Sequence, residues 1–285
     1  MLSNSLDNQI ESFIDMALAE DIGDGDHSSL ACILSAATGK AKLLVKEDGI
    51  IAGIEIAKKI FERVDPDFKI ELLIQDGNVI KTGDIALIIE GKKQDILKTE
   101  RLVLNCMQRM SGIASHTNRL VKLIEGTNAK LLDTRKTTPG IRFLEKMAVK
   151  IGGGFNHRFG LYDMIMLKDN HIDYAGGIAK AINSVHSYLE EKNKDLKIEI
   201  EARNLSEVEE ILSIGKIDRI MLDNFSISDL EKAILIIDKK YETEASGGIT
   251  EKTIRSYAET GVDYISVGAL THHFKSLDLS LKATN

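Results

Sequence analysis

The sequence lacks the features of a membrane or secreted protein. No apolar run approaches the roughly 20 residues that a membrane-spanning helix needs. The first residues, MLSNSLDNQIESF, have neither the cationic nor the apolar region of a signal peptide. Cysteine is scarce as well: Cys32 and Cys106 lie far apart in apolar surroundings, which predicts two buried thiols in a reducing cytoplasm, not a disulfide or a metal site.

Basic residues and proline are also limited in number. The 285 residues include 44 Asp and Glu against 37 Lys and Arg, a formal net charge of −7, and aromatic residues are not interleaved with the basic ones. Both facts argue against a nucleic-acid-binding protein. With two prolines and no low-complexity tract, the chain has no Pro-rich linker. Its 43% apolar and 28% charged residues are typical of a globular protein with one large domain, or with a small and a larger one.

One segment reverses the sign of the charge. From Arg135 to Lys168 the chain has seven Lys and Arg against two acidic residues, a net charge of +5, which leaves −12 for the remainder. A local charge opposite to that of the whole protein is typical of an anion-binding site. For Arg142, Lys146 and Lys150 a solvated helix face is an alternative, but the other four cations lie beside Gly, Pro, Asp and Asn.

The first hundred residues mix helical and strand patterns. Apolar residues at helical spacing predict a helix in NQIESFIDMALAED. Alternating residues predict strands in KAKLLVKEDGIIAG, KIELLI and DIALIIEG. A long helical pattern, QDILKTERLVLNCMQRMSG, follows and connects this part to the next. We interpret the N-terminal region as a small α+β domain.

From residue 130 the chain alternates strand and helix. The predicted strands lie in AKLLDTR, DMIMLKD, IEIEA, RIMLDN, ETEASGG and DYISVGA. Ser206 with Glu209, and Ser228 with Glu231, fit capping boxes that begin two of the helices. Repeated strand–helix units predict a parallel sheet. Six strands in series predict a barrel or a partly open barrel, whose active face is at the carboxyl ends of the strands.

Polar and small residues follow nearly every predicted strand. They occur at Asp133–Lys136, Lys168–His171, Glu201–Arg203, Asp223–Asn224, Ser246–Gly248 and Val267–Ala269. The cations among them, with Arg158, suit carboxylates and phosphates. Glu201 and Asp223 suit a hydrated magnesium ion, and the small residues after the last two strands suit a phosphate. Together they predict a doubly anionic substrate and a metal-bound phosphate.

Several of these residues have alternative interpretations. An SGG sequence is more often a simple turn, and a carboxylate at a strand end is often a helix cap or an ion-pair partner. His157 and His171 lack the Cys or His partners of a zinc site. We expect His157 to donate hydrogen bonds to an anion, whereas His171 can equally fix its loop. Lys168 can instead be a Schiff-base lysine.

The segment GGGFNHRFG precedes a predicted strand, and in a simple barrel this would place it at the wrong end of the sheet. We therefore expect residues 137–162 to bend back across the mouth. The three consecutive glycines permit such a bend, because glycine adopts backbone conformations closed to other residues.

Nearly end to end, the chain resembles the nicotinate-nucleotide pyrophosphorylase (carboxylating) family, also called quinolinate phosphoribosyltransferase. The most specific motifs are LLDTRKTTPGIR and GGGFNHRFGLYDMIMLKDNHI. The others are ALAEDIGDGD, KEDGIIAG, ILKTERLVLNCMQRMSGIAS, IEIEARNL, IMLDNF, EASGGI and GVDYISVGALTH. His27 and His273-Phe274 depart from the family pattern, outside the charged positions.

The resemblance implies an N-terminal α/β sandwich domain at residues 1–110 and an incomplete parallel α/β barrel of about six strands at 111–270. A tail at 271–285 then packs back on the N-terminal domain. It also implies a homodimer in which the small domain of one chain covers the barrel mouth of the other. The implied reaction joins quinolinate to phosphoribosyl pyrophosphate, with Mg²⁺, and yields nicotinate mononucleotide, pyrophosphate and carbon dioxide in NAD biosynthesis.

The resemblance also assigns residues, motif by motif. The quinolinate carboxylates would meet Arg101, Arg135, Lys136, His157, Arg158 and Lys168. Glu201 and Asp223 would hold the ribose and, through water, the magnesium ion. The site would be completed by Thr134 and by the turns of Ser246, Gly247 and Gly248 and of Val267, Gly268 and Ala269. The expected catalytic residues are Lys136, Lys168, Glu201 and Asp223.

Two other functions remain open from the sequence. A related group of uncertain substrate, found beside molybdate-transport genes, shares part of the DTRKTTPG pattern. A basic pocket can also serve a non-enzymatic anion sensor or a nucleic-acid contact. Release of pyrophosphate and carbon dioxide that depends on quinolinate separates all three.

Overall fold

The computed structural model describes residues 6–284, which form two compact units. The first unit contains the residues up to Asn118, residues 137–153 and the C-terminal residues from Leu270. The second contains residues 119–136 and 154–269. No helix within residues 6–284 is long and apolar enough to cross a membrane.

The first unit is built on a four-stranded antiparallel sheet with the order β12-β1-β5-β3. Its strands are β1 (Thr38–Val45), β3 (Lys69–Leu72), β5 (Ile85–Lys92) and β12 (Leu279–Thr284), and β2 (Gly49–Ile50) pairs separately with β4 (Val79–Ile80). The alternation that predicted β1 appears as burial: Ala41, Leu43 and Val45 are buried, and the residues between them are more exposed. β1, β3 and β5 were all predicted from this pattern.

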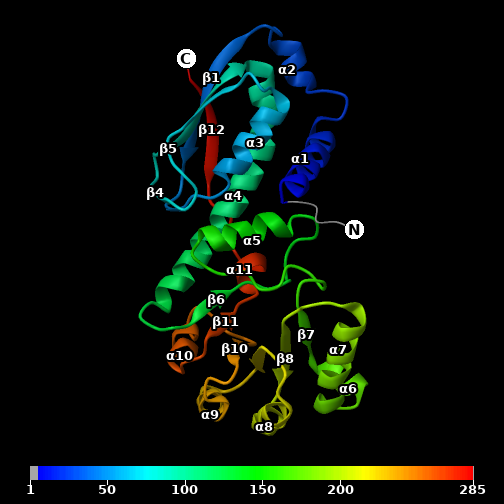
Figure 1. Cartoon of the computed structure of the whole chain (residues 1–285). Helices are drawn as coiled ribbons and strands as arrows, with labels where there is room; N and C mark the ends of the chain where they lie inside the picture. The colour runs from blue at the N-terminus through cyan, green and yellow to red at the C-terminus, as the bar shows by residue number, and fades with distance from the viewer. Residues whose placement is uncertain (1–5, 285) are drawn as a thin grey trace. The chain divides into compact units, whose positions relative to one another are not determined.

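Helices complete the first unit. They are α1 (Leu6–Ile22), α2 (His27–Cys32), α3 (Ile54–Val64), α4 (Lys93–Leu123), which continues into the second unit, α5 (Arg142–Ile151) and α11 (Ala269–His272), which begins at the boundary between units. In Figure 1 α1 lies beside α3. The apolar stripe of α3 is fully buried, and its Phe61 meets Phe68 edge to face, with 5.8 Å between ring centroids. The helix begins where Asp76 accepts the N–H of Ile54.

The two cysteines occupy different environments. Cys106 is buried in α4, and burial raises the pKa of its thiol to about 12. Cys32 is exposed, so the prediction of two buried thiols is wrong for this residue. The reason is the orientation of α2: its buried residue is Ser29, whereas Leu30 and the following Leu34 face solvent with 59% and 82% of their surface exposed. Both thiols are free.

The second unit contains the six predicted strands, all parallel, in the order β6-β11-β10-β9-β8-β7. They are β6 (Lys130–Leu132), β7 (Ile165–Leu167), β8 (Ile198–Ala202), β9 (Arg219–Asp223), β10 (Glu242–Ser246) and β11 (Tyr264–Ser266). Within the described residues β6 and β7 are edge strands that do not pair with each other, so the sheet is an incomplete barrel, as predicted.

Helices connect these strands and lie on the outer side of the sheet (Figure 1). They are α6 (Asp169–Ala175), α7 (Ile178–Lys192), α8 (Leu205–Ile214), α9 (Ile227–Ile237) and α10 (Ile254–Glu259). The caps of α8 and α9 lie two residues before the predicted caps Ser206 and Ser228. Asn204 and Ser226 are the actual caps, because their side-chain oxygens accept the N–H of the third following residue.

Residues 137–162, which we expected to bend back across the mouth, are divided between the two units. Residues 137–153 belong to the first unit, where α5 carries Arg142, Lys146 and Lys150. Lys146 is buried and Lys150 is exposed, so these cations are not all on a solvated face. The remainder returns to the second unit, where Phe155 forms a parallel bridge with Leu132 at the carboxyl end of β6. The FNHR residues therefore lie at the same end of the sheet as the strand exits.

Gly112 provides a test of the packing in the first unit. A Cβ atom at this position of α4 would overlap the backbone carbonyl of Lys275. We expect Gly112→Ala to lower the free energy of unfolding by about 1–3 kcal/mol, because backbone on both sides must shift. Thermal denaturation measures the change. Lys122→Ala, at an exposed position of the same helix, is the control, and equal midpoints for the two variants would contradict the close packing.

Candidate active site

Charged side chains line the inside of the six-stranded sheet. All five residues of β8 are buried, and acids alternate with apolar residues: Glu199 and Glu201 lie between Ile198, Ile200 and Ala202. The parallel register sets Glu199 opposite Arg219 of β9, and Arg219 opposite Glu242 of β10. Because side chains alternate along a strand, one face of the sheet receives the acids and the other packs against the helices.

The carboxyl ends of β7, β8 and β9 form one polar cluster. The ammonium of Lys168 pairs with one carboxylate oxygen of Glu201, and the other accepts the backbone N–H of Asp169 at 3.1 Å. Asp223 is half-buried and accepts from the side chain of Asn224 at 2.7 Å. Burial and then the charge of Glu201 raise the pKa of Asp223, while Lys168 lowers it. The cluster thus places two carboxylates and one ammonium within electrostatic reach of one another.

Two arginines extend this cluster. Arg158 is half-buried and donates to the carbonyl of Met164 at 3.2 Å. Burial and the charge of Arg135 lower the pKa of Arg158, whereas Glu199, Asp163 and Glu201 act in the opposite direction. Arg135 itself is exposed. These cations are therefore close to the carboxylates of the strand ends, as the sequence predicted for the exits of a parallel sheet.

The remaining predicted residues occupy turns at the same ends. Lys136 is exposed, and its N–H donates to the hydroxyl of Thr134 at 3.0 Å. Ser246 accepts the N–H of Asn224 at 2.8 Å, which connects the β9 and β10 exits. Gly247 has a φ of +96° and faces Asn224 so closely that a side chain would not fit. After β11, Val267 donates to the carbonyl of Leu132, and Gly268 and Ala269 follow.

Two predicted residues lie elsewhere or act differently. Arg101 is exposed on α4 in the first unit, whereas the other candidates belong to the second. His171 is exposed and its Nδ1 accepts the N–H of Lys168 at 3.0 Å, a contact of the loop-fixing kind that the sequence left open as an alternative.

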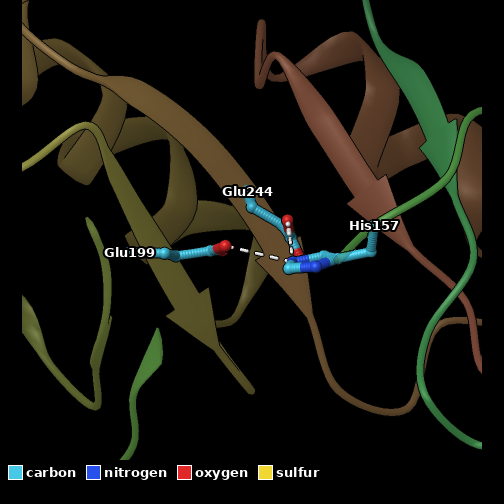
Figure 2. A group of neighbouring side chains, drawn as sticks. All are labelled: His157, Glu199 and Glu244. Atoms are coloured by element: carbon cyan, nitrogen blue, oxygen red, sulfur yellow. Dashed lines mark ion pairs between the residues drawn. The ribbon is translucent and has the colours of Figure 1, made fainter. Parts of the chain in front are cut away.

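Beneath the strand ends lies a buried cluster of opposite charges (Figure 2). The Nε2 atom of His157 lies 3.0 Å from a Glu199 oxygen and 3.3 Å from a Glu244 oxygen. The same two oxygens face Arg219, at 3.8 Å and 3.1 Å. Both glutamates are fully buried, and no described residue donates a well-aligned hydrogen bond to Glu199, so its contacts are ion pairs.

The charges and the burial of this cluster shift the pKa values of His157 and Glu199. Burial lowers the pKa of His157, but the two carboxylates outweigh burial and raise it to about 9. Burial and Glu244 raise the pKa of Glu199. The Nδ1 atom of His157 accepts the N–H of Arg158 at 2.7 Å, so the ring hydrogen that faces the two carboxylates is the one on Nε2. Arg219 faces both carboxylates and also pairs with Glu242, so the acids around it outnumber this one fixed cation.

Sequence reasoning missed the acids of this cluster. Glu199 precedes Glu201 by two residues and Glu244 precedes Ser246 by two, so the period of a strand places each pair on one face. That signal was available in IEIEA and ETEAS, but an acid in mid-strand was not expected to be buried.

Comparisons with known proteins cover almost the whole chain. Residues 26–111 match a model described as the quinolinate phosphoribosyl transferase N-terminal domain, and residues 113–282 match the corresponding C-terminal domain. The chain is 46% identical to "Quinolinate phosphoribosyltransferase [decarboxylating] 1b" of Nicotiana tabacum, with 96% of this chain and 82% of the relative covered.

Bacterial relatives are similar over their full length. The chain is 39% identical to "Probable nicotinate-nucleotide pyrophosphorylase [carboxylating]" of Bacillus subtilis, with 97% and 94% of the two chains covered. The crystal structure of NadC from Streptococcus pyogenes superimposes with a TM-score of 0.93 at 38% identity, and all of both chains is covered. Sequence, domain content and fold thus agree that this chain belongs to the quinolinate phosphoribosyltransferase family.

Proposed function

We propose that this protein transfers the phosphoribosyl group of phosphoribosyl pyrophosphate to quinolinate, with loss of carbon dioxide, to give nicotinate mononucleotide and pyrophosphate. The observation that carries the proposal is the mixed cluster of Arg135, Arg158 and Lys168 with Glu201 and Asp223 at the strand ends. Cations of this kind suit a dicarboxylate and a diphosphate, and the chain belongs to a family whose members are named for this reaction.

The proposed chemistry needs little acid–base catalysis. The pyridine nitrogen of quinolinate has a free lone pair, so no base is required to make it a nucleophile. The site has to hold two anions side by side and stabilise the departing pyrophosphate, which is a matter of positioning and electrostatics. Once the nitrogen is bonded to ribose it carries positive charge, and it can stabilise the carbanion that remains when the adjacent carboxylate leaves as carbon dioxide.

Different residues at the strand ends would bind different parts of the two substrates. Lys168, with Lys136 and the two arginines, would bind the quinolinate carboxylates, and Glu201 would orient Lys168 through their ion pair. Thr134 and the turns Ser246–Gly248 and Val267–Ala269 would hold the phosphoribosyl end. The glycines in these turns would let a phosphate approach the backbone closely, although Gly247 is already required by its own turn.

Glu201 and Asp223 are the residues that would hold magnesium. Burial and then the charge of Glu201 raise the pKa of Asp223, and a divalent cation would relieve the repulsion between the two carboxylates. Oxygen donors at a partly exposed site also fit an ion that retains several waters. Magnesium bound there would neutralise part of the charge of the pyrophosphate group.

We further infer a homodimer with shared active sites, located in the cytoplasm. The dimer follows from the family resemblance and from Arg101, which lies outside the unit that carries the other candidates. The cytoplasm is inferred from two free thiols, one of them exposed.

Quinolinate-dependent release of pyrophosphate and carbon dioxide from phosphoribosyl pyrophosphate tests the proposed function. Radiolabelled carboxylate and a coupled pyrophosphate assay measure the two products. A purified protein that releases neither would end the proposal and favour the related group of uncertain substrate or an anion sensor.

Removing single cations tests whether Lys168 and Arg135 bind the carboxylates of quinolinate. We expect Lys168→Ala and Arg135→Ala each to lower turnover roughly ten- to several-hundred-fold, since a charge-assisted hydrogen bond is worth about 1.5–3 kcal/mol. Circular dichroism checks that the variants fold. Lys194→Ala, an exposed lysine before β8, is the control. Turnover within twofold of wild type for both variants would rule out the assignment.

Substrate choice gives an independent test. We expect nicotinate to be a poor substrate, because the cations that face the missing carboxylate would stay partly buried and unpaired. Initial rates on nicotinate and quinolinate at equal concentration measure the preference. Equal rates would indicate a different phosphoribosyltransferase.

The shared site is tested by mixing two inactive variants. Arg101→Ala and Lys168→Ala chains, unfolded and refolded together, pair at random, so about half of the dimers are mixed. Each mixed dimer then regains one intact site of two, and activity should return to about one quarter of wild type. If both residues serve the site of their own chain, no activity returns in a sample shown to contain mixed dimers.

A further inference from the structure

Glu199 and Glu244 lie below the candidate site and have no part in the reaction described so far. They extend from β8 and β10 toward the ring of His157, which follows the Phe155 bridge beside β6 (Figure 2). Both carboxylates are fully buried and 9% of His157 is exposed. Burying acids in mid-strand is costly, so their retention calls for a specific partner.

A metal ion is the first alternative. One ligand atom from each of the three residues lies within 4.8 Å of the others, a spacing that suits a metal ion. However, the carboxylate oxygens that face His157 also face Arg219, which lies 3.1 Å from Glu244. A divalent cation held between these oxygens would lie against the Arg219 guanidinium, and the two like charges would repel each other. The position of Arg219 therefore favours His157 as the partner of the acids.

Both nitrogens of the His157 ring are engaged inside the unit. Nε2 faces the two carboxylates, and Nδ1 accepts the N–H of Arg158 at 2.7 Å. The backbone N–H of His157 donates to the buried carboxylate of Asp133 at 2.8 Å, which also accepts from Asn156 at 2.6 Å. The orientation of the ring therefore sets the peptide that carries Arg158, and the ring leaves no nitrogen to donate to a substrate.

We propose that Glu199 and Glu244 are positioning residues that orient the His157 ring and, through it, direct Arg158 toward the substrate. His157 is then a support for Arg158 and does not itself contact quinolinate, in contrast to the role that the family resemblance assigns to it. The inference rests on the proposed function, because Arg158 is taken as a ligand of quinolinate.

The test is a double-mutant cycle of His157→Gln and Glu244→Gln. Glu244 is preferred to Glu199 because it lies on a different strand from Glu201. We expect each single variant to raise the KM for quinolinate about tenfold, while kcat and the KM for phosphoribosyl pyrophosphate change less than about threefold. Since both changes act on one chain of contacts, the double variant should be no worse than either single one.

Glu242→Gln is the matched control. Glu242 lies on the same strand, two residues before Glu244, and pairs with Arg219 at 3.0 Å. It should leave the quinolinate KM unchanged. If Glu244→Gln does not fold, Glu199→Gln replaces it in the cycle.

Three results would overturn the inference. An unchanged KM in Glu244→Gln with a raised KM in His157→Gln would mean that His157 contacts the substrate directly. Effects that multiply to about a hundredfold in the double variant would mean that the residues act independently. Equal changes in the KM of both substrates would mean a general structural role.

Calorimetric titration of quinolinate distinguishes failure of this inference from failure of the proposed function. If the wild-type protein does not bind quinolinate, the proposed function is wrong. If the wild-type protein binds it and Glu244→Gln binds it equally well, only this inference is wrong.

Discussion

A carboxylate inside a parallel sheet must be matched by a donor or a cation, and this requirement shapes the second unit. Glu201 is matched by Lys168, Asp133 by the His157 backbone and Asn156, and Glu244 by Arg219. Each partner comes from a different strand or connection. The charges therefore depend on the strand register, because a shift of one residue would turn every acid toward the helices.

The same register arranges the charges in three layers along the sheet, and Arg219 joins the first layer to the second. Arg219, Glu242 and Tyr264 interact near the amino ends, with the Arg219 guanidinium 4.0 Å from the Tyr264 ring centroid. His157 and its acids form the middle layer, and Lys168 with its carboxylates forms the last. Buried ion pairs add little to stability compared with apolar packing. The buried ion pairs of this sheet are therefore better explained by a role in orienting the polar side chains at the carboxyl ends of the strands.

The sequence predicted the strands well because their signal is local. All six parallel strands and three of the antiparallel ones carry apolar runs or alternation within a few residues, and the exits place Lys168, Glu201 and Asp223 at one edge. The predictions that failed concern features that depend on tertiary contacts. Ser206 and Ser228 fit a capping pattern, yet Asn204 and Ser226 accept the helix N–H groups. The inward direction of His157 follows from acids more than 40 residues away, and no local pattern contains that information.

The pairing of the last strand with the first has a consequence for biosynthesis. β12 ends at residue 284 and covers the outer edge of β1, which begins at residue 38. While the ribosome is still adding residues, β1 pairs with β5 on one side only, and its other side exposes unpaired N–H and C=O groups. A nascent chain of this protein thus carries an open sheet edge from the time that β5 is made until β12 is made, and chaperones that shield such edges would matter most in that interval.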